Sequence, residues 1–350
     1  MRRNRRKRNG TEDVQIFRAL IEGTPPSVEY LRRAVALQLE KRFAEAALEY
    51  RQALRLDPDN PFALNNYGFL LLRLGVVEDA HQLFRRAIEL APDYALAHNN
   101  LGSAYFHQGF LEEAMAEYGE ASLLDARYAM PHRNLALVYR LLGRLDEAVE
   151  EYRTYFRLAP AETKDADAHY DLGVMLEESG RAEEAAEEYE RALADDPRHA
   201  KALNNLGLVH FSRREIERAV EFYRRALEAD EGFALARYNL GLAYAALGEH
   251  QQSVEQFECL LALDADSVQA ASNLGVLYTT LGRYDDAVKI FERLVAREPS
   301  QPTLRFNLAV AYQGKGLSEK AKTEFREVIE LEPPGSPRAA RAQREMLLAM

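Results

Sequence analysis

The sequence predicts an all-α solenoid that is built from about nine copies of a helix–turn–helix repeat. Three observations lead to this fold class. A frame with the character of NNLG, as in LNNYGFLLLRLG and HNNLGSAYFHQG, returns every 34 residues. Each copy holds two amphipathic stretches of helical period with a turn between them. The chain is 47% hydrophobic and 29% charged, which is the composition of a folded protein and not of a disordered one.

The repeats are counted from the first residue after each loop, which is named frame position 1. Frame positions 2–14 are expected to form a first helix and positions 18–30 a second helix. The only break in step is a loop insertion of three residues, Thr163 to Asp165. The nine repeats therefore cover residues 27–335, and their first residues are 27, 61, 95, 129, 166, 200, 234, 268 and 302.

The turn between the two helices carries glycine in seven of the nine repeats. A left-handed helix stop favours a residue without a Cβ atom. Lys41 and Arg214 stand at this position in the first and sixth repeats, where we expect a less relaxed turn. The turn glycines are Gly75, Gly109, Gly143, Gly180, Gly248, Gly282 and Gly316.

Small and large residues alternate at positions that must pack the two helices together. Frame position 8 is glycine or alanine, and position 20 is mostly alanine, which we expect to face it. Large residues fill positions 11 and 24, as in Tyr278 with Phe291, and proline closes most repeats. A glycine inside a helix costs about 1 kcal/mol relative to alanine, so close helix contact must offset that cost.

This pattern resembles the tetratricopeptide repeat (TPR), whose period and small, aromatic and proline positions it shares. No repeat has the tryptophan that the family often carries at frame position 4. The resemblance implies a right-handed superhelix whose first helices line the concave side. Arg32 and Arg33 replace the usual Asn and Leu of the first repeat, as expected of a solvent-facing end repeat.

The segments before and after the nine repeats are predicted to form separate elements. Residues 1–26 form a basic, flexible tail with a short helix over about 12–22. Residues 336–350 form a capping helix, because Ser336 can act as N-cap and Pro337 suits the first helical position. We expect Ala340, Leu347 and Met350 of this helix to cover the last repeat.

Charge and composition exclude several function classes. The formal net charge is −11 although the opening MRRNRRKRNG is strongly basic, so contact with nucleic acid or an anionic membrane is expected only through residues 2–8. Cys259 is the only cysteine, so no intramolecular disulfide can form. The sequence shows neither a secretory signal nor a membrane-spanning apolar run, which predicts a cytoplasmic protein. It does not predict an oligomeric state.

Asparagine stands at frame position 6 in seven of eight consecutive repeats, and aspartate in the other. Asparagine is a mediocre helix former, so its recurrence in mid-helix needs a reason. It supports the fold, by bonding within its own helix or to the loop before it, or it binds a guest. The guest-binding alternative resembles the asparagine ladder in the TPR superhelix of O-linked N-acetylglucosamine transferase, which holds a peptide backbone. The eight residues are Asn66, Asn100, Asn134, Asp171, Asn205, Asn239, Asn273 and Asn307.

Apolar residues flank this ladder on the inward face. Position 9 is nearly always apolar, and aromatic residues recur at or near positions 5 and 12. The alternative is that these side chains pack only against neighbouring repeats. With the eight ladder residues, the predicted peptide-binding site comprises Phe69, Phe106, Tyr170, Phe211, Tyr238 and Phe306.

No motif in the sequence indicates chemistry, a metal or a cofactor. His98, His132 and His169 share frame position 4 of successive repeats, but helices that far apart cannot place three ligands on one ion. Paired carboxylates recur at the starts of second helices, where they suit the helix dipole. The two-carboxylate clamp of some TPR proteins is not expected, because no repeat has Asn at position 9 and Arg133 is the only basic residue at position 5.

The predicted function is therefore a non-catalytic scaffold for another protein, which binds an extended segment in the concave groove. Two alternatives stay open: a substrate-recognition or adaptor subunit of a separate transferase, and an assembly factor for a membrane or secretion complex.

Overall fold

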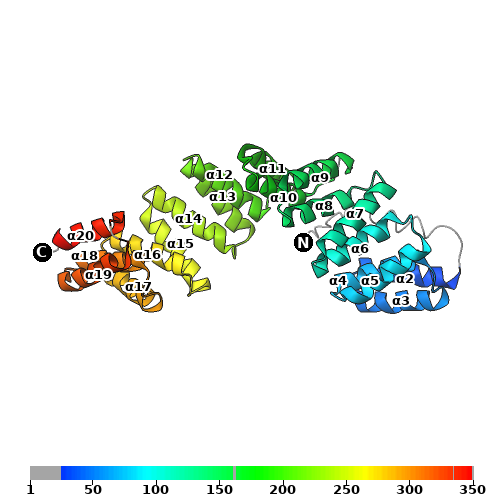
Figure 1. The fold of residues 1–350 in the computed structure, drawn as a ribbon, viewed down its shortest axis with the longest axis horizontal. Coiled ribbons are helices and arrows are strands. Elements are labelled where there is room, and N and C mark those ends of the chain that lie inside the picture. The colour runs from blue at the N-terminus through cyan, green and yellow to red at the C-terminus, as the bar shows by residue number, and fades with distance from the viewer. Residues whose placement is uncertain (1–24, 161–162, 334, 349–350) are drawn as a thin grey trace, which may run out of the picture. The chain divides into compact units, whose positions relative to one another are not determined.

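The structure is a computed structural model that describes residues 25–160, 163–333 and 335–348. Within these residues the chain forms only helices, turns and loops, from α2 to α20 (Figure 1). The predicted tail and its short helix at 12–22 lie outside the described residues. None of the described helices combines the length and the apolar character that crossing a membrane requires.

The described chain divides into two compact blocks, one up to residue 185 and one from residue 186, and the division falls inside α11 (Ala182–Asp195). The helices of the N-terminal block are α2 (Pro26–Leu39), α3 (Phe43–Leu56), α4 (Pro61–Arg73), α5 (Val77–Leu90), α6 (Ala95–Gln108), α7 (Leu111–Leu124), α8 (Met130–Leu141), α9 (Leu145–Leu158) and α10 (Ala166–Glu178).

The C-terminal block has the same alternation. Its helices are α12 (Ala200–Ser212), α13 (Ile216–Ala229), α14 (Ala234–Ala246), α15 (His250–Leu263), α16 (Val268–Thr280), α17 (Tyr284–Arg297), α18 (Pro302–Gly314), α19 (Ser318–Leu331) and α20 (Pro337–Leu348). The repeat helices agree with the predicted ones to within two residues, because the turn residues and the loops fix both ends of each helix.

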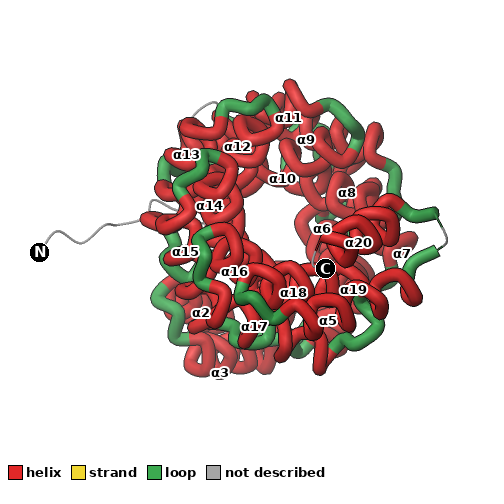
Figure 2. Tube along the Cα trace, turned by 90° about the vertical axis from the view of Figure 1, so that its left-hand side faces the viewer, coloured by secondary structure: helices red, strands yellow, loops and turns green. Residues whose placement is uncertain are grey.

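Helices pack in the order in which they occur in the chain. Each first helix packs on the second helix of its own repeat, as α4 on α5 and α16 on α17, and each second helix packs on the next first helix. First helices of neighbouring repeats also touch, as α4 with α6 and α12 with α14. In each block the first helices therefore lie side by side along the inner face, and the second helices lie outside them (Figure 2).

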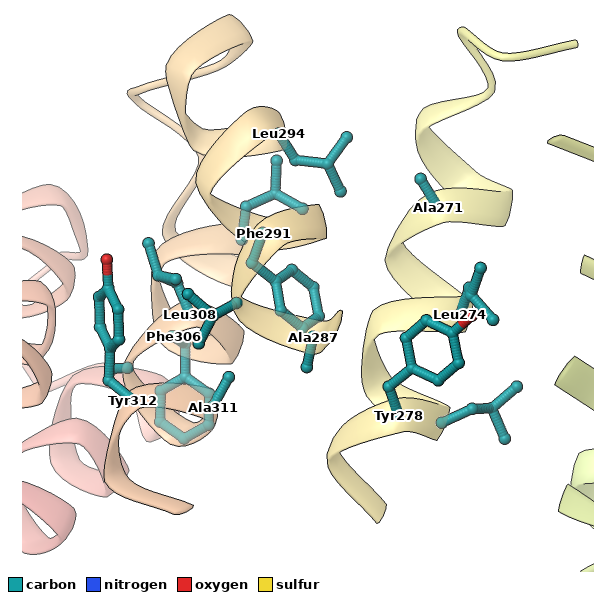
Figure 3. Close-up of a cluster of buried hydrophobic side chains, with 14 of the residues drawn as sticks. Ala271, Leu274, Tyr278, Ala287, Phe291, Leu294, Phe306, Leu308, Ala311 and Tyr312 are labelled. Atoms are coloured by element: carbon teal, nitrogen blue, oxygen red, sulfur yellow. The ribbon is translucent and has the colours of Figure 1, made fainter. Parts of the chain in front are cut away.

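The glycine at frame position 8 makes room for the ring at position 24 of the same repeat. A Cβ atom on Gly275 would lie 2.6 Å from Cζ of Phe291, which is fully buried. Figure 3 shows Phe291 between α17 and α16, in a cluster that includes Leu274 and Tyr278. Position 20 lies beside the same backbone, since the Ser253 hydroxyl donates to the Gly241 carbonyl at 2.6 Å. The residues at positions 20 and 24 of the second helix therefore both face the small residue at position 8, whereas the sequence predicted this contact only for the alanine at position 20.

The turns confirm the expectation for Lys41 and Arg214. Both adopt positive φ, 63° and 65°, as the seven turn glycines do. The left-handed conformation costs a residue with a Cβ atom about 1–2 kcal/mol. These two turns are therefore strained for their residue type.

Replacing Arg214 with glycine is expected to stabilise the C-terminal block by about 0.5–1 kcal/mol, since the relief of strain exceeds the added freedom of the unfolded chain. The adjacent Arg213 has an ordinary φ of −79°, so Arg213→Gly is the matched control and is expected to destabilise. Urea denaturation of the two variants measures the difference. Equal losses in both would show that the turn at Arg214 is not strained.

The capping helix α20 begins as predicted, because the Ser336 hydroxyl accepts a bond from the Ala339 amide at 3.0 Å. The face that it buries differs from the prediction. Ala339 and Ala342 are buried, whereas Ala340 is exposed and Leu347 is 61% exposed. The prediction was wrong because several neighbouring alanines could each face the last repeat, and the sequence did not show which of them the rotation of the helix about its axis would bury. Met350 lies outside the described residues.

Candidate binding surface on the first helices

The eight ladder residues all lie on first helices, on the face that we name the first-helix face: frame positions 2, 5, 6, 9 and 12 of each repeat. Asn66, Asn100 and Asn239 are buried, with 5–8% of their surface exposed. The other five, Asn134, Asp171, Asn205, Asn273 and Asn307, are half-buried. The ladder residues are therefore the less accessible part of this face, and none of them is fully exposed.

In the N-terminal block two ladder amides, Asn100 and Asn134, bond to the repeat before them. Asn100 donates from Nδ2 to Oδ1 of Asn65 at 2.9 Å, and Asn134 donates in the same way to Asn99 at 2.9 Å. The acceptors stand at frame position 5 of the preceding repeat. We name this series of bonds, from position 6 to the preceding position 5, the amide relay.

The amide relay recurs in the C-terminal block with one change of partner. Asn239 donates to Oδ1 of Asn204 at 2.9 Å. Asn273 donates to the Tyr238 hydroxyl at 3.1 Å, because tyrosine replaces asparagine at that position 5. Every donor belongs to the later repeat. The relay thus ties α6, α8, α14 and α16 to the first helix before each of them by buried or partly buried polar bonds, which burial strengthens. Asn205 departs from the relay, because its Nδ2 donates to the Tyr189 hydroxyl of α11 at 3.0 Å.

Charged residues replace the amides at the one step where the period is broken. Arg133 stands at position 5, and the next position 6 is Asp171. Burial raises the pKa of Asp171, while a hydrogen bond from Tyr152 at 3.1 Å and the charge of Arg133 oppose that rise. The single Asp of the ladder therefore coincides with the single Arg at position 5, but the two act on each other only through their charges, since Arg133 pairs with Asp165 at 3.2 Å and Asp171 accepts from Tyr152.

The relay is a structural role that differs from the two considered from sequence, since the amides bond neither within their own helix nor to the loop. It uses one amide hydrogen of each donor. Within the described residues, no donor reaches Oδ1 of Asn100, Asn134 or Asn239, so these oxygens keep their capacity to accept a bond.

Five of the six predicted aromatic residues are half-buried: Phe69, Phe106, Tyr170, Phe211 and Tyr238. Tyr238 also packs edge-on against Phe257, with ring centroids 5.7 Å apart. Phe306 differs, because it is buried against Phe325 and lies beneath Arg341 of the capping helix.

Aliphatic side chains supply more of the open apolar surface than the aromatic ones. Leu208 and Val276 at position 9 are about two-fifths exposed, and Leu235 at position 2 is half exposed. Phe62 at position 2 is similarly open and packs edge-on against Tyr94. Leu235 was missed from sequence, although its equivalence to Phe62 in the frame would have identified it.

The histidines at frame position 4 make pairwise contacts within their own repeats. Nδ1 of His98 lies 2.7 Å from Glu117, and Nδ1 of His132 lies 2.7 Å from Glu151. The hydrogen bond to Glu117 raises the pKa of His98. Over the described ranges, no group of three or more potential metal ligands comes together.

Comparisons with known structures identify the fold. The C-terminal part of a TPR repeat-containing protein from Cytophaga hutchinsonii is 16% identical, with a TM-score of 0.57 over 69% of this chain and 97% of its own. PilF of Pseudomonas aeruginosa is 24% identical, with a TM-score of 0.51 over 62% of this chain and 97% of its own. YrrB, a TPR protein with an unusual peptide-binding site, is 22% identical, with a TM-score of 0.45 over 53% and 95%. A comparison with curated proteins gives no match.

Family profiles agree with the period and with the helix pairs. One tetratricopeptide repeat profile matches residues 68–131, 170–232 and 238–302, which is more than half of the chain. Three further profiles of the same repeat match residues 39–75, 127–198 and 278–346. The predicted fold class, a right-handed α-solenoid, is confirmed, and the fold is that of a protein-interaction scaffold. The chain belongs to the tetratricopeptide repeat family.

Proposed function

We propose that this protein is a non-catalytic scaffold that binds an extended segment of a partner protein along the first-helix face. The observation that carries the proposal lies in the C-terminal block. There the exposed side chains of Leu208, Leu235 and Val276 flank relay asparagines on the same helices. An open apolar strip beside unused hydrogen-bond acceptors is the surface that an extended peptide needs.

The chemistry of the relay suits a peptide backbone. An extended segment presents N–H groups that lose water when they approach a protein, and the free Oδ1 of Asn239 can accept one of them. First helices lie about 8–10 Å apart, and a peptide advances about 3.3 Å per residue. Each repeat would therefore meet about every third residue of the segment, while the apolar strip would bind the side chains between them.

A peptide array tests this proposal directly. Twelve-residue peptides of varied sequence are probed with the full-length protein, and the peptides that bind are measured by fluorescence anisotropy. The variant Leu208→Ser/Leu235→Ser/Val276→Ser removes the apolar strip only from exposed positions. We expect at least about tenfold weaker binding with nearly unchanged denaturation, since the loss is apolar contact with the guest.

Leu263→Ser is the matched control, because Leu263 is 64% exposed but lies on the second helix α15. This control should bind the same peptides with wild-type affinity. An array without any bound peptide would refute the proposal. So would binding that survives the triple substitution and is lost on Leu263→Ser, since the site would then lie on the second helices.

A further inference from the structure

A cavity of about 550 Å³ opens on the first-helix face at the end of the C-terminal block. Its apolar side includes Val276 of α16 and Val310 of α18, and its polar side includes Asn307 and two arginines of α20, Arg338 and Arg341. Its volume lies in the usual range of small-ligand pockets. The sequence prediction includes Asn307 and Phe306 of this place in the peptide-binding site, but it assigns no binding role to α20, which was predicted only to cap the array.

Arg341 continues the register of the ladder. The period that places the ninth repeat at residue 302 makes residue 336 frame position 1 of a tenth, and Arg341 then stands at position 6. Its contact is also that of the amide relay, since it meets position 5 of the preceding repeat. Its guanidinium carbon lies 5.0 Å from the ring centroid of Phe306. The last member of the ladder therefore carries a permanent positive charge where the others carry an amide.

The charge of Arg341 is not neutralised by the protein. Arg341 is exposed and has no ion pair within the described residues, whereas the neighbouring Arg338 pairs with Glu332. A planar guanidinium can hold both oxygens of a carboxylate. The cavity thus holds an arginine that is available to pair with an anion and, next to it, an apolar wall.

We propose that this cavity binds the C-terminal residue of the partner segment. The terminal carboxylate pairs with Arg341, and an apolar side chain of the same residue packs against Val276 and Val310. A C-terminal residue is the occupant that carries both groups on one Cα atom, whereas an internal acidic residue offers a carboxylate without the apolar side chain. This inference rests on the proposed function, because it assigns one end of the segment that the first-helix face binds.

The site is different from the two-carboxylate clamp that the sequence argues against. That clamp draws its residues from first helices of the repeats, at positions 2, 5, 6 and 9. Here the capping helix α20 supplies two arginines to the cavity; Arg338 is paired with Glu332, and Arg341 is the guanidinium that acts beside the apolar wall. The prediction that the clamp is absent is therefore compatible with a carboxylate site at this place.

The test compares free and amidated C-termini. Full-length protein is probed with a library of hexapeptides that end in Leu, Val, Ile or Met, each made with a free carboxylate and with an amide. We expect amidation to weaken binding at least about tenfold, as the loss of a charge-assisted pair does. In Arg341→Gln, both forms should bind with the affinity of the amide. Arg344→Gln, an exposed arginine of α20 that does not line the cavity, is the control and should keep the preference.

Each other outcome has a definite meaning. Peptides that bind equally well in both forms would overturn the cavity assignment while they support binding along the first-helix face. A preference for internal Asp or Glu that disappears in Arg341→Gln would overturn the assignment to a chain terminus. An absence of any bound peptide would refute the proposed function together with this inference.

Discussion

Replacing Phe291 with alanine is expected to lower the free energy of unfolding of the C-terminal block by about 3–5 kcal/mol, the usual cost of emptying a buried aromatic site. The ring is fully buried and lies against Gly275. A Cβ atom at position 275 would overlap the ring, so glycine leaves the space that the ring occupies. The cavity left behind would open between α16 and α17. Neither helix can close it, because each is held by its other neighbour in the stack.

Guanidinium denaturation measures the loss, and hydrogen exchange locates it. In a repeat array each repeat contacts only its neighbours, so faster exchange is expected in α16, α17 and α18 and not in the N-terminal block. Lys289→Ala is the control, because this side chain is exposed on the same helix and should change stability by less than about 0.5 kcal/mol. A loss below about 1 kcal/mol in Phe291→Ala would show that the ring is not part of a close-packed core.

Replacing Asp165 with alanine is expected to destabilise the N-terminal block by about 3–5 kcal/mol, as the removal of one member of a buried ion pair does. Asp165 is 9% exposed and lies 3.2 Å from Arg133, which would lose its charge partner. Its carboxylate also accepts from the Tyr155 hydroxyl at 2.6 Å and caps α10 through the Ala168 amide at 3.1 Å. One substitution thus removes the acceptor of three contacts, those with Arg133, Tyr155 and the backbone of α10.

Asp165→Asn separates the charge from the cap. The amide oxygen can still accept from the backbone of α10, so this variant is expected to lose only about half as much stability. Lys164→Ala changes the exposed residue beside it and should have almost no effect. Thermal denaturation of the three variants gives the ranking. Equal stability of Asp165→Ala and wild type would show that the charge of Arg133 is satisfied by other groups.

The fold was predictable because each of its determinants is local and recurs. The turn at Gly75 and the ring at Phe291 each obey a rule that acts within one repeat, so nine copies reinforce the same inference. The rotation of α20 was not predictable in the same way. Ala339, Ala340 and Ala342 are chemically alike, and only packing against α19 decides that the first and third are buried.

The candidate site was predictable in position but not in bonding. The recurrence of Asn100 and its equivalents identified the first-helix face. Their partners, such as Asn65, lie in the preceding repeat, so no rule confined to one repeat could reveal them. A signal existed in the sequence: residues one repeat apart match in chemistry, and Arg133 stands before Asp171 where Asn65 stands before Asn100.

The amide relay has a consequence for how such an array grows. Each repeat of the form Asn65–Asn66 or Asn204–Asn205 carries an acceptor for its successor and a residue able to donate to its predecessor. A duplicated copy inserted in register would therefore satisfy both neighbours at once and leave no buried amide without a partner. Duplication of whole repeats then leaves no buried amide unsatisfied and so costs little free energy of folding. A duplication of any other length breaks a buried hydrogen bond. Where this chain does depart from the period, at Thr163–Asp165, the Arg133–Asp171 exchange occupies that same step.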